Sequence, residues 1–180
     1  MNDFFSNPQT IKEYLEPARI QFYRDIVQLF YHEKIDVNGK TLADVGCMTP
    51  SLNTGFDFSE AALNVAKTVF PNANYQVHDL YKLLLQRFNV ILCTEVLKLL
   101  LYPDDIIANL ISRLNPTGIL FLSVQNGRLN SYYGHINFWS PESWQIILSK
   151  NSLNSKIKTG LFSETLIWGI IYQNNDKIII

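Results

Sequence analysis

The chain has 180 residues, of which 47% are apolar, 13% aromatic and 17% charged, and its formal net charge is -1 at pH 7. A chain of this length suits one domain with a single core, and this composition excludes extensive disorder. The near-neutral charge and the lack of a dense Lys/Arg run give no electrostatic footprint for nucleic acid or an anionic membrane, so neither partner is expected.

We expect one domain over residues 1–180, with an N-terminal helical cap at 1–38 and an α/β core at 39–180. The first residues show no basic stretch followed by an apolar one, and no run reaches the roughly 18 apolar residues that span a bilayer. A cytoplasmic location is therefore expected. Cys47 and Cys93 lie in strand-like runs, which predicts buried free thiols.

The predicted elements alternate between helix and strand. Apolar residues at helical spacing predict helices between 10 and 34, with a break at Pro17. Short apolar runs predict strands at 41–47, 55–58, 75–78, 89–94 and 118–124. Helices are predicted between them at 60–70, 104–114 and 141–150, with Ser59 and Ser140 as N-caps. Two last strand-like runs, 156–162 and 166–173, predict an antiparallel hairpin.

This alternation predicts an α/β fold with a doubly wound, mainly parallel, Rossmann-like sheet of the seven-stranded type and a C-terminal antiparallel hairpin. The segment between Cys47 and Thr54 is too short for a usual crossover, so the first crossover helix is predicted to be missing. A sheet face left uncovered in this way predicts a homodimer, a protein partner, or covering by the N-terminal helices.

The loop after the first predicted strand carries a single glycine. Residues 44–50 read DVGCMTP, which resembles the glycine loop of the class I S-adenosylmethionine (SAM) dependent methyltransferases, where an acidic residue precedes G-x-G-x-G. The resemblance implies that Asp44, Gly46 and Cys47 contribute to a SAM site. Met48 and Pro50 stand at the later glycine positions, where they remove space and conformational freedom.

The second predicted strand ends in a segment that resembles the same family. Residues 55–59 read GFDFS, and the resemblance implies that Asp57 binds the ribose hydroxyls of SAM, with Phe58 beside it. A carboxylate suits this role because it accepts hydrogen bonds from two adjacent hydroxyls. The alternative is that Asp57 caps the following helix, although Ser59 already suits that position.

The third and fourth predicted strands end in VHDL and CTEVL, which also resemble the family. The first segment implies contacts of Asp79 and Leu80 with the adenine, although aspartate is also a common turn residue. The second implies that Thr94 and Glu95 face the methyl-transfer region. At 98–99 the chain has Lys-Leu where the family has a glutamate and a histidine.

The segment GHINFWSPE at 134–142 resembles the small-molecule branch of the family, where this loop forms part of the acceptor pocket. His135 is a candidate general base, because imidazole titrates near neutral pH, and Glu95 is the second candidate catalytic residue. A structural histidine that anchors the loop is the alternative. Neighbouring aromatic residues suit either an acceptor pocket or the core: Tyr132, Tyr133, Phe138 and Trp139.

These segments together imply SAM-dependent methyl transfer to an oxygen or nitrogen of a small-molecule acceptor, with SAM as the cofactor. The altered glycine loop leaves enzymatic activity open, and the alternative is a catalytically inactive methyltransferase-like binding or scaffold subunit. The histidines and cysteines show no metal-ligand spacing, so no metal is expected.

Overall fold

The computed structural model describes residues 17–47, 53–129, 133–152, 154–159 and 163–173. It forms two compact units, Met1–Asp79 and Leu80–Ile180, and each unit is described by itself below. The expectation of one domain with a helical cap stays a prediction, and the part of the predicted N-terminal helices before Pro17 lies outside the described residues.

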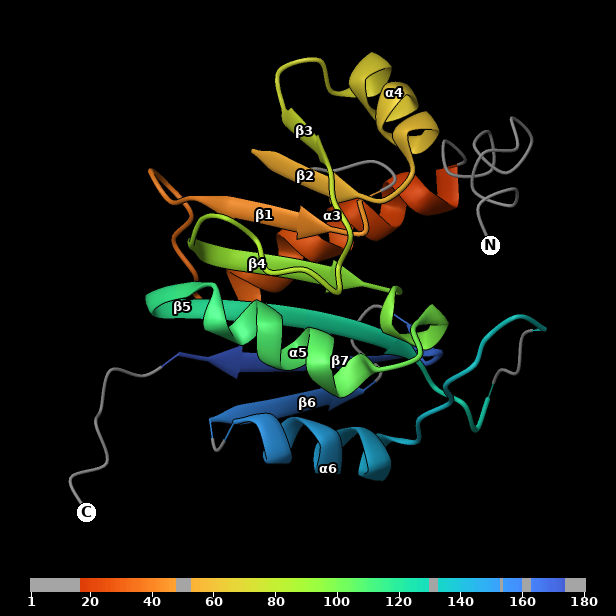
Figure 1. Ribbon diagram of the computed structural model, residues 1–180. Helices are drawn as coiled ribbons and strands as arrows, with labels where there is room; N and C mark the ends of the chain where they lie inside the picture. The colour runs from red at the N-terminus through yellow and green to blue at the C-terminus, as the bar shows by residue number, and fades with distance from the viewer. Residues whose placement is uncertain (1–16, 48–52, 130–132, 153, 160–162, 174–180) are drawn as a thin grey trace. The chain divides into compact units, whose positions relative to one another are not determined.

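The first unit contains a parallel sheet (Figure 1). In chain order its elements are α3 (Pro17–His32), β1 (Leu42–Val45), β2 (Thr54–Asp57), α4 (Glu60–Val69) and β3 (Asn74–Val77). β2 pairs in parallel with both β1 and β3. α4 packs on β2 and β3, and it begins at the predicted N-cap, because Ser59 Oγ accepts a hydrogen bond from the Ala62 N–H at 3.2 Å.

The second unit combines parallel and antiparallel strands. Its elements are β4 (Phe88–Thr94), the 3-10 helix η1 (Leu97–Leu99), α5 (Pro103–Ser112), β5 (Leu114–Gln125), α6 (Pro141–Asn151), β6 (Ser155–Thr159) and β7 (Leu166–Tyr172). β4 and β5 are parallel, whereas β7 runs antiparallel to both β5 and β6. α5 and α6 pack against each other and lie on the same face of these strands (Figure 1).

The strand order is β3-β2-β1-β4-β5-β7-β6, which is the doubly wound α/β arrangement with a C-terminal antiparallel hairpin that the sequence predicts. Residues 46–53 connect β1 to β2, and the two strands pair in parallel despite this short connection. Extended chain covers about 3.3 Å per residue, so this segment is long enough to return along a short strand. Within it, residues 48–52 lie outside the described part of the chain.

The prediction of the start of β5 was wrong. The preceding helix ends at Ser112, and Leu114 already belongs to β5. The pairing between β4 and β5 then shifts, and Thr117 adopts a positive φ of 64°. A Cβ on Gly118 would lie 2.8 Å from the Asn115 carbonyl oxygen. This bulge therefore requires glycine, and it moves the beginning of β5 ahead of its apolar run.

The core of the second unit contains Trp144 of α6 and Trp168 of β7, both fully buried. Gly169 lets α6 approach β7 closely, because a Cβ at this position would lie 2.7 Å from Leu148 Cδ1 and 2.9 Å from Trp144 Nε1. Both cysteines of the chain are buried thiols, as predicted.

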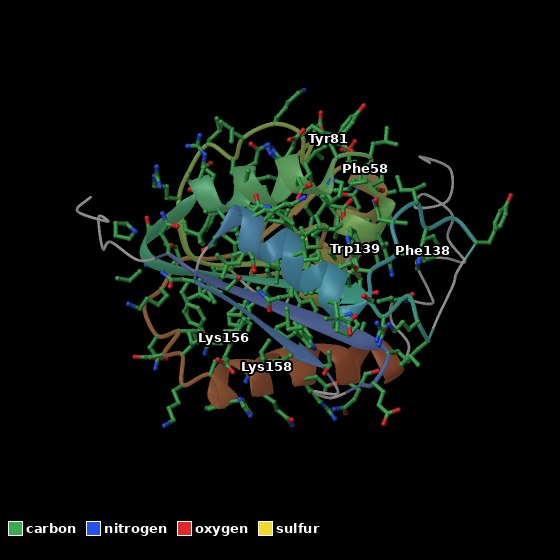
Figure 2. The ribbon with its side chains drawn as sticks, turned by 90° about the horizontal axis from the view of Figure 1, so that it is seen from below. Phe58, Tyr81, Phe138, Trp139, Lys156 and Lys158 are labelled. Carbon is green, nitrogen blue, oxygen red and sulfur yellow. The ribbon has the colours of Figure 1, made fainter. Side chains whose placement is uncertain are left out.

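β6 lies at one edge of the strand order and carries Lys156 and Lys158. Residues two apart share a face of a strand, and the two side chains extend from the same side of β6 (Figure 2). The Lys156 ammonium lies 4.8 Å from the centroid of the Tyr172 ring. Among the helices that the structure describes, none is long and apolar enough to cross a membrane.

Candidate functional site

Two buried carboxyl groups lie toward the carboxyl ends of β1 and β2. Asp44 and Asp57 each expose only 4% of their surface. Burial, followed by the nearby Asp57 carboxylate, raises the pKa of Asp44 to about 7. Burial also raises the pKa of Asp57 to about 6, against the lowering effect of the Ser59 and Phe58 backbone N–H groups. A ligand that brings hydrogen-bond donors or positive charge would stabilise both carboxylates.

The turn between β2 and α4 fixes the Asp57 side chain. Asp57 Oδ1 accepts a hydrogen bond from the Ser59 N–H at 2.8 Å, and the Asp57 carbonyl accepts one from the His78 N–H at 2.8 Å. Ser59 is the N-cap of α4, so the alternative in which Asp57 has this role is wrong. A carboxylate offers about four acceptor positions, which leaves Asp57 able to accept from a ligand.

Gly46 and Cys47 complete this cluster. Gly46 has a positive φ of 76°, and the N–H groups of Gly46 and Cys47 both donate to the Phe56 carbonyl, at 2.7 and 3.1 Å. Burial, then the Asp44 and Asp57 carboxylates, raise the pKa of the Cys47 thiol. The structure therefore brings together four of the residues that the sequence assigns to the cofactor, and the thiol among them is neutral.

The other cofactor candidates of this region are less enclosed. Phe58 exposes 43% of its surface. Asp79, which follows β3, is exposed, and Leu80 is half-buried at the start of the second unit. The adenine contacts assigned to Asp79 and Leu80 stay predictions.

A second polar cluster lies at the carboxyl end of β4, next to Thr94. Glu95 adopts a positive φ of 62°, a region that residues other than glycine rarely occupy. Its Oε2 pairs with Lys98 Nζ at 2.6 Å, and its Oε1 accepts from Ser123 Oγ at 3.3 Å. The Glu95 N–H also donates to the Ser123 carbonyl at 3.0 Å. These bonds hold Glu95 in its unusual backbone conformation.

His135 lies in the electrostatic neighbourhood of Glu95 and Lys98. Burial, then the positive charge of Lys98, lower the pKa of His135, while Glu95 acts in the opposite direction. The imidazole also contacts the Phe138 ring, with 6.0 Å between centroids. A lowered pKa leaves the imidazole neutral at pH 7, the form that accepts a proton. The two candidate catalytic residues, His135 and Glu95, thus influence each other.

The contact between this loop and η1 was not predicted from the sequence. The Lys98 carbonyl accepts hydrogen bonds from the N–H groups of Ile136 and Asn137, at 3.0 and 3.2 Å. Asn137 Nδ2 donates to the carbonyls of Leu97 and Leu100, at 3.1 and 2.6 Å. These two carbonyls lie 40 and 37 positions before Asn137 in the chain. No local spacing in the sequence signals such a contact.

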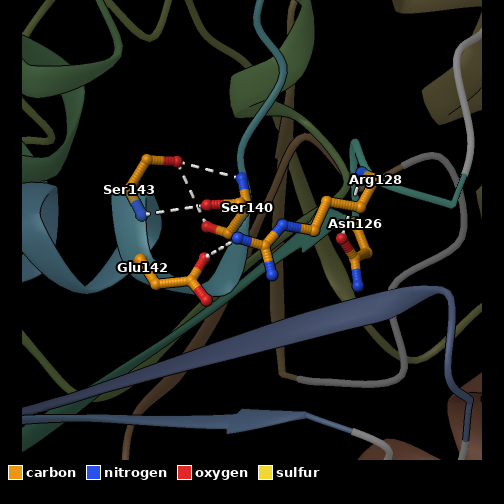
Figure 3. A network of polar contacts seen from close by, with 5 residues as sticks. All are labelled: Asn126, Arg128, Ser140, Glu142 and Ser143. Atoms are coloured by element: carbon orange, nitrogen blue, oxygen red, sulfur yellow. Dashed lines mark hydrogen bonds and ion pairs between the residues drawn. The ribbon is translucent and has the colours of Figure 1, made fainter.

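The base of the same loop is closed next to α6. The Gly127 N–H donates to the Trp139 carbonyl at 2.8 Å, and Asn126 forms a parallel bridge with Trp139. Arg128 Nη2 lies 2.8 Å from Glu142 Oε2. Figure 3 shows this ion pair beside the capping box at the start of α6.

The aromatic residues considered for an acceptor pocket divide between core and surface. Trp139 is buried and packs against Trp144, with 5.2 Å between ring centroids. Tyr133 and Phe138 are exposed, and Tyr132 lies outside the described residues. Core packing therefore accounts for Trp139, whereas Phe138 remains available to a ligand.

Further exposed apolar side chains lie in and beside the segment that follows η1. Tyr81, Leu101 and Tyr102 are all exposed. The Leu101 N–H donates to Tyr81 Oη at 2.9 Å, and the Tyr81 and Tyr102 rings meet edge to face at 6.3 Å. Figure 2 shows Tyr81 among the labelled side chains. In the described part of the chain, no group of three or more His, Cys, Asp or Glu residues is arranged to hold a metal ion.

The strand order, the antiparallel β7 and the carboxylates of β1 and β2 define a class I, Rossmann-like methyltransferase fold. A model of the methyltransferase domain family matches residues 18–155. The chain therefore belongs to the methyltransferase domain family.

Curated relatives and solved structures agree with this assignment. The chain is 33% identical over 119 residues to a ubiquinone biosynthesis O-methyltransferase of Coxiella burnetii (strain RSA 493 / Nine Mile phase I), over 57% of this chain and 51% of the relative. The chain thus spans about half the length of the curated relatives that it matches.

Solved structures of methyltransferases match nearly the whole chain. The N-methyltransferase NodS from Bradyrhizobium japonicum WM9, solved with S-adenosyl-l-homocysteine (SAH), matches with a TM-score of 0.71 and 15% identity, over 97% of this chain and 96% of that one. The magnesium protoporphyrin IX methyltransferase ChlM from Synechocystis PCC 6803, with bound SAM, matches with a TM-score of 0.69 and 18% identity, over 94% of each chain. At these identities the likeness shows the fold.

Proposed function

We propose that the chain binds SAM at the carboxyl ends of β1 and β2 and transfers its methyl group to an oxygen or nitrogen of a small-molecule acceptor. The observation that carries this proposal is the buried Asp57 carboxylate at the end of β2, held by the Ser59 N–H and able to accept further hydrogen bonds. Family membership supports it, and so do structural neighbours that were solved with SAM or SAH.

The donors and charges of SAM suit this cluster. Its ribose brings two hydroxyl donors for Asp57, and its amino and sulfonium groups bring positive charge next to Asp44. Both carboxyl groups have a raised pKa because burial disfavours the charged form, and both kinds of contact would oppose that effect. The positive φ of Gly46 permits close approach to the backbone.

His135 is proposed as the general base toward the acceptor. When bound, SAM supplies a methyl group on a positively charged sulfur. The methyl group would pass to the acceptor oxygen and SAH would be left, while the neutral His135 imidazole would accept the proton of the acceptor hydroxyl. Alignment of the reacting atoms dominates such a transfer.

One observation favours a second candidate, a catalytically inactive methyltransferase-like binding or scaffold subunit. The N–H groups of Gly46 and Cys47 already donate to the Phe56 carbonyl, so they are occupied within the chain rather than offered to a ligand's carboxylate. Met48 and Pro50 stand at the later glycine positions. A cytoplasmic location and a partner on an uncovered sheet face stay predictions in either case.

Calorimetric titration with SAM and SAH tests the proposal. We expect micromolar affinity for the wild-type protein, and Asp57→Ala should weaken it by about 1 to 3 kcal/mol, the usual cost of leaving polar groups unpaired. Glu60→Gln removes an exposed carboxylate next to the same turn and should leave the affinity unchanged. A folded protein that binds neither ligand at millimolar concentration would favour the scaffold subunit.

A further inference from the structure

Asn137 attaches the loop that carries His135 to η1. A side-chain amide has two N–H donors on one nitrogen, and Asn137 directs this nitrogen to the carbonyls of Leu97 and Leu100, at 3.1 and 2.6 Å. Two carbonyl partners on the same side fix which end of the amide faces η1. The Asn137 main chain adds a third bond, from its N–H to the Lys98 carbonyl at 3.2 Å.

The turn that receives these bonds is itself held in place. Lys98 pairs with Glu95 at 2.6 Å, and each of these two side chains is only 12% exposed. Glu95 is in turn bonded through its side chain and its main chain to Ser123 of β5. The loop segment therefore rests on a charge pair anchored to two neighbouring strands, rather than on a mobile surface.

We propose that Asn137 is a positioning residue for the methyl-transfer reaction: by fastening the chain two residues after His135 to η1, it holds the imidazole beside Glu95 and Lys98. This inference rests on the proposed function, in which His135 takes the acceptor's proton. Asn137 itself touches neither the acceptor nor SAM in this role. Asn137 acts indirectly, by fixing the backbone of the loop that carries His135.

The ion pair at the base of the loop does not replace this attachment. Arg128 and Glu142 are 61% and 62% exposed, and pairs of that kind contribute little because solvent screens them. Arg128 precedes His135 in the chain, and Glu142 lies in the first turn of α6, so their pair joins the two ends of the loop rather than the segment at His135. The charged groups that act on His135 are Lys98 of η1 and Glu95 at the end of β4, and Asn137 keeps His135 within their reach.

The test is the titration of His135 by proton NMR in the wild-type protein and in Asn137→Leu, which has a side chain of similar size without donors. The chain has three histidines, so the variant His135→Gln assigns the signal and the exposed His32 serves as an internal reference. We expect Asn137→Leu to raise the pKa of His135 toward its ordinary value. Asn151→Leu, which removes a side-chain amide bonded to the Ile147 carbonyl, should leave it unchanged.

Two further variants keep the proposal testable if Asn137→Leu does not fold. Asn137→Ser is a smaller change that retains a short donor, and Lys98→Gln removes the charge but keeps the carbonyl that receives the loop. Asn137→Ser should raise the pKa of His135 because the loop loses its attachment, and Lys98→Gln, which removes the charge that lowers this pKa, is the positive control for the titration. An unchanged titration of His135 in a folded Asn137→Leu or Asn137→Ser protein would overturn the inference.

Steady-state kinetics separates this inference from the proposed function. We expect kcat to fall about 10- to 100-fold in Asn137→Leu, the scale expected for a misplaced catalytic group, and KM for the acceptor to rise while KM for SAM stays the same. A wild-type protein without methyl transfer would contradict the proposed function, whereas the NMR titration would still decide whether Asn137 positions His135. If KM for SAM rose in Asn137→Leu as much as KM for the acceptor, the role of Asn137 would not be confined to the loop that carries His135.

Discussion

Asp44 and Asp57 place two acidic groups where water is scarce, and each must either lose its charge or find a partner. The pKa of Asp44 is raised to about 7 and that of Asp57 to about 6. Strongly raised pKa values are frequent at ligand-binding sites. The free-energy cost of burying a carboxylate there is offset when a ligand binds to it. The pair therefore makes the stability of the free protein depend on pH.

The first prediction concerns this dependence. Because the folded-state pKa of Asp44 lies above its ordinary value of 3.8, the native state holds its proton at pH values where the unfolded state has lost it. The free energy of unfolding should therefore fall as pH rises toward 7. Asp57 contributes to the fall in unfolding free energy mainly below pH 6. Asp44→Asn should therefore flatten the fall between pH 6 and 7. Urea unfolding at half-unit intervals measures the slope, and equal slopes in both proteins would refute this account.

At the scale of elements, the helix α6 begins with a strong local signal. Ser140 Oγ accepts from the Ser143 N–H at 3.3 Å, and Ser143 Oγ accepts from the Ser140 N–H at 2.9 Å. This reciprocal capping box lies beside the exposed Arg128–Glu142 pair (Figure 3). The capping box and the ion pair both connect the start of α6 to its surroundings.

The second prediction is that the cap matters more than the ion pair. Ser140→Ala should lower the free energy of unfolding by about 1 kcal/mol, the typical effect of losing an N-cap side chain. Arg128→Ala should have no measurable effect on stability, because its ion pair with Glu142 is exposed and screened by solvent. Chemical denaturation of the two variants side by side measures the difference, and a larger loss in Arg128→Ala would reverse the ranking.

The third prediction concerns the contact between α6 and β7. Gly169→Ala places a methyl group against Leu148 and the rigid indole of Trp144, both fully buried. Overpacking of this kind should cost about 1 to 3 kcal/mol of unfolding free energy. Ile146→Ala, at an exposed position of the same helix, is the control and should cost much less. Equal losses would show that α6 can shift away from β7.

At the scale of the whole molecule, the fold was more predictable than the site. Alternating apolar runs and helical periods predicted the strands, and the final two runs predicted the antiparallel hairpin that β6 and β7 form. Asp57 is the last residue of β2, so the sheet itself places it at the carboxyl end of the strand, whereas its ribose contact, which the family resemblance implies, stays a prediction. The bulge at Gly118 was missed, because a close contact with the Asn115 carbonyl leaves no periodic signal. Asn137 was missed because its partners are distant in the chain.

The fourth prediction tests cofactor binding on the intact molecule. A ligand at 100 times its dissociation constant adds about 2.7 kcal/mol to the stability of the state that binds it. For a chain of this size about 1 kcal/mol corresponds to a shift of roughly 2 to 4 °C, so saturating SAH should raise Tm by about 5 to 10 °C. Calorimetry should show this rise in the wild-type protein and a much smaller one in Asp57→Ala. A comparable shift in both would remove Asp57 from the binding site.

The lysines of β6 affect how copies of the molecule meet each other. An edge strand presents unpaired backbone N–H and C=O groups, and a flat apolar edge would recruit the same edge of another copy into a growing fibril. Lys156 and Lys158 extend from one side of β6 (Figure 2), and bringing two such edges together would force four ammonium groups into close range. Charge repulsion at this border thus keeps the outer edge of β6 from becoming the template of an aggregate.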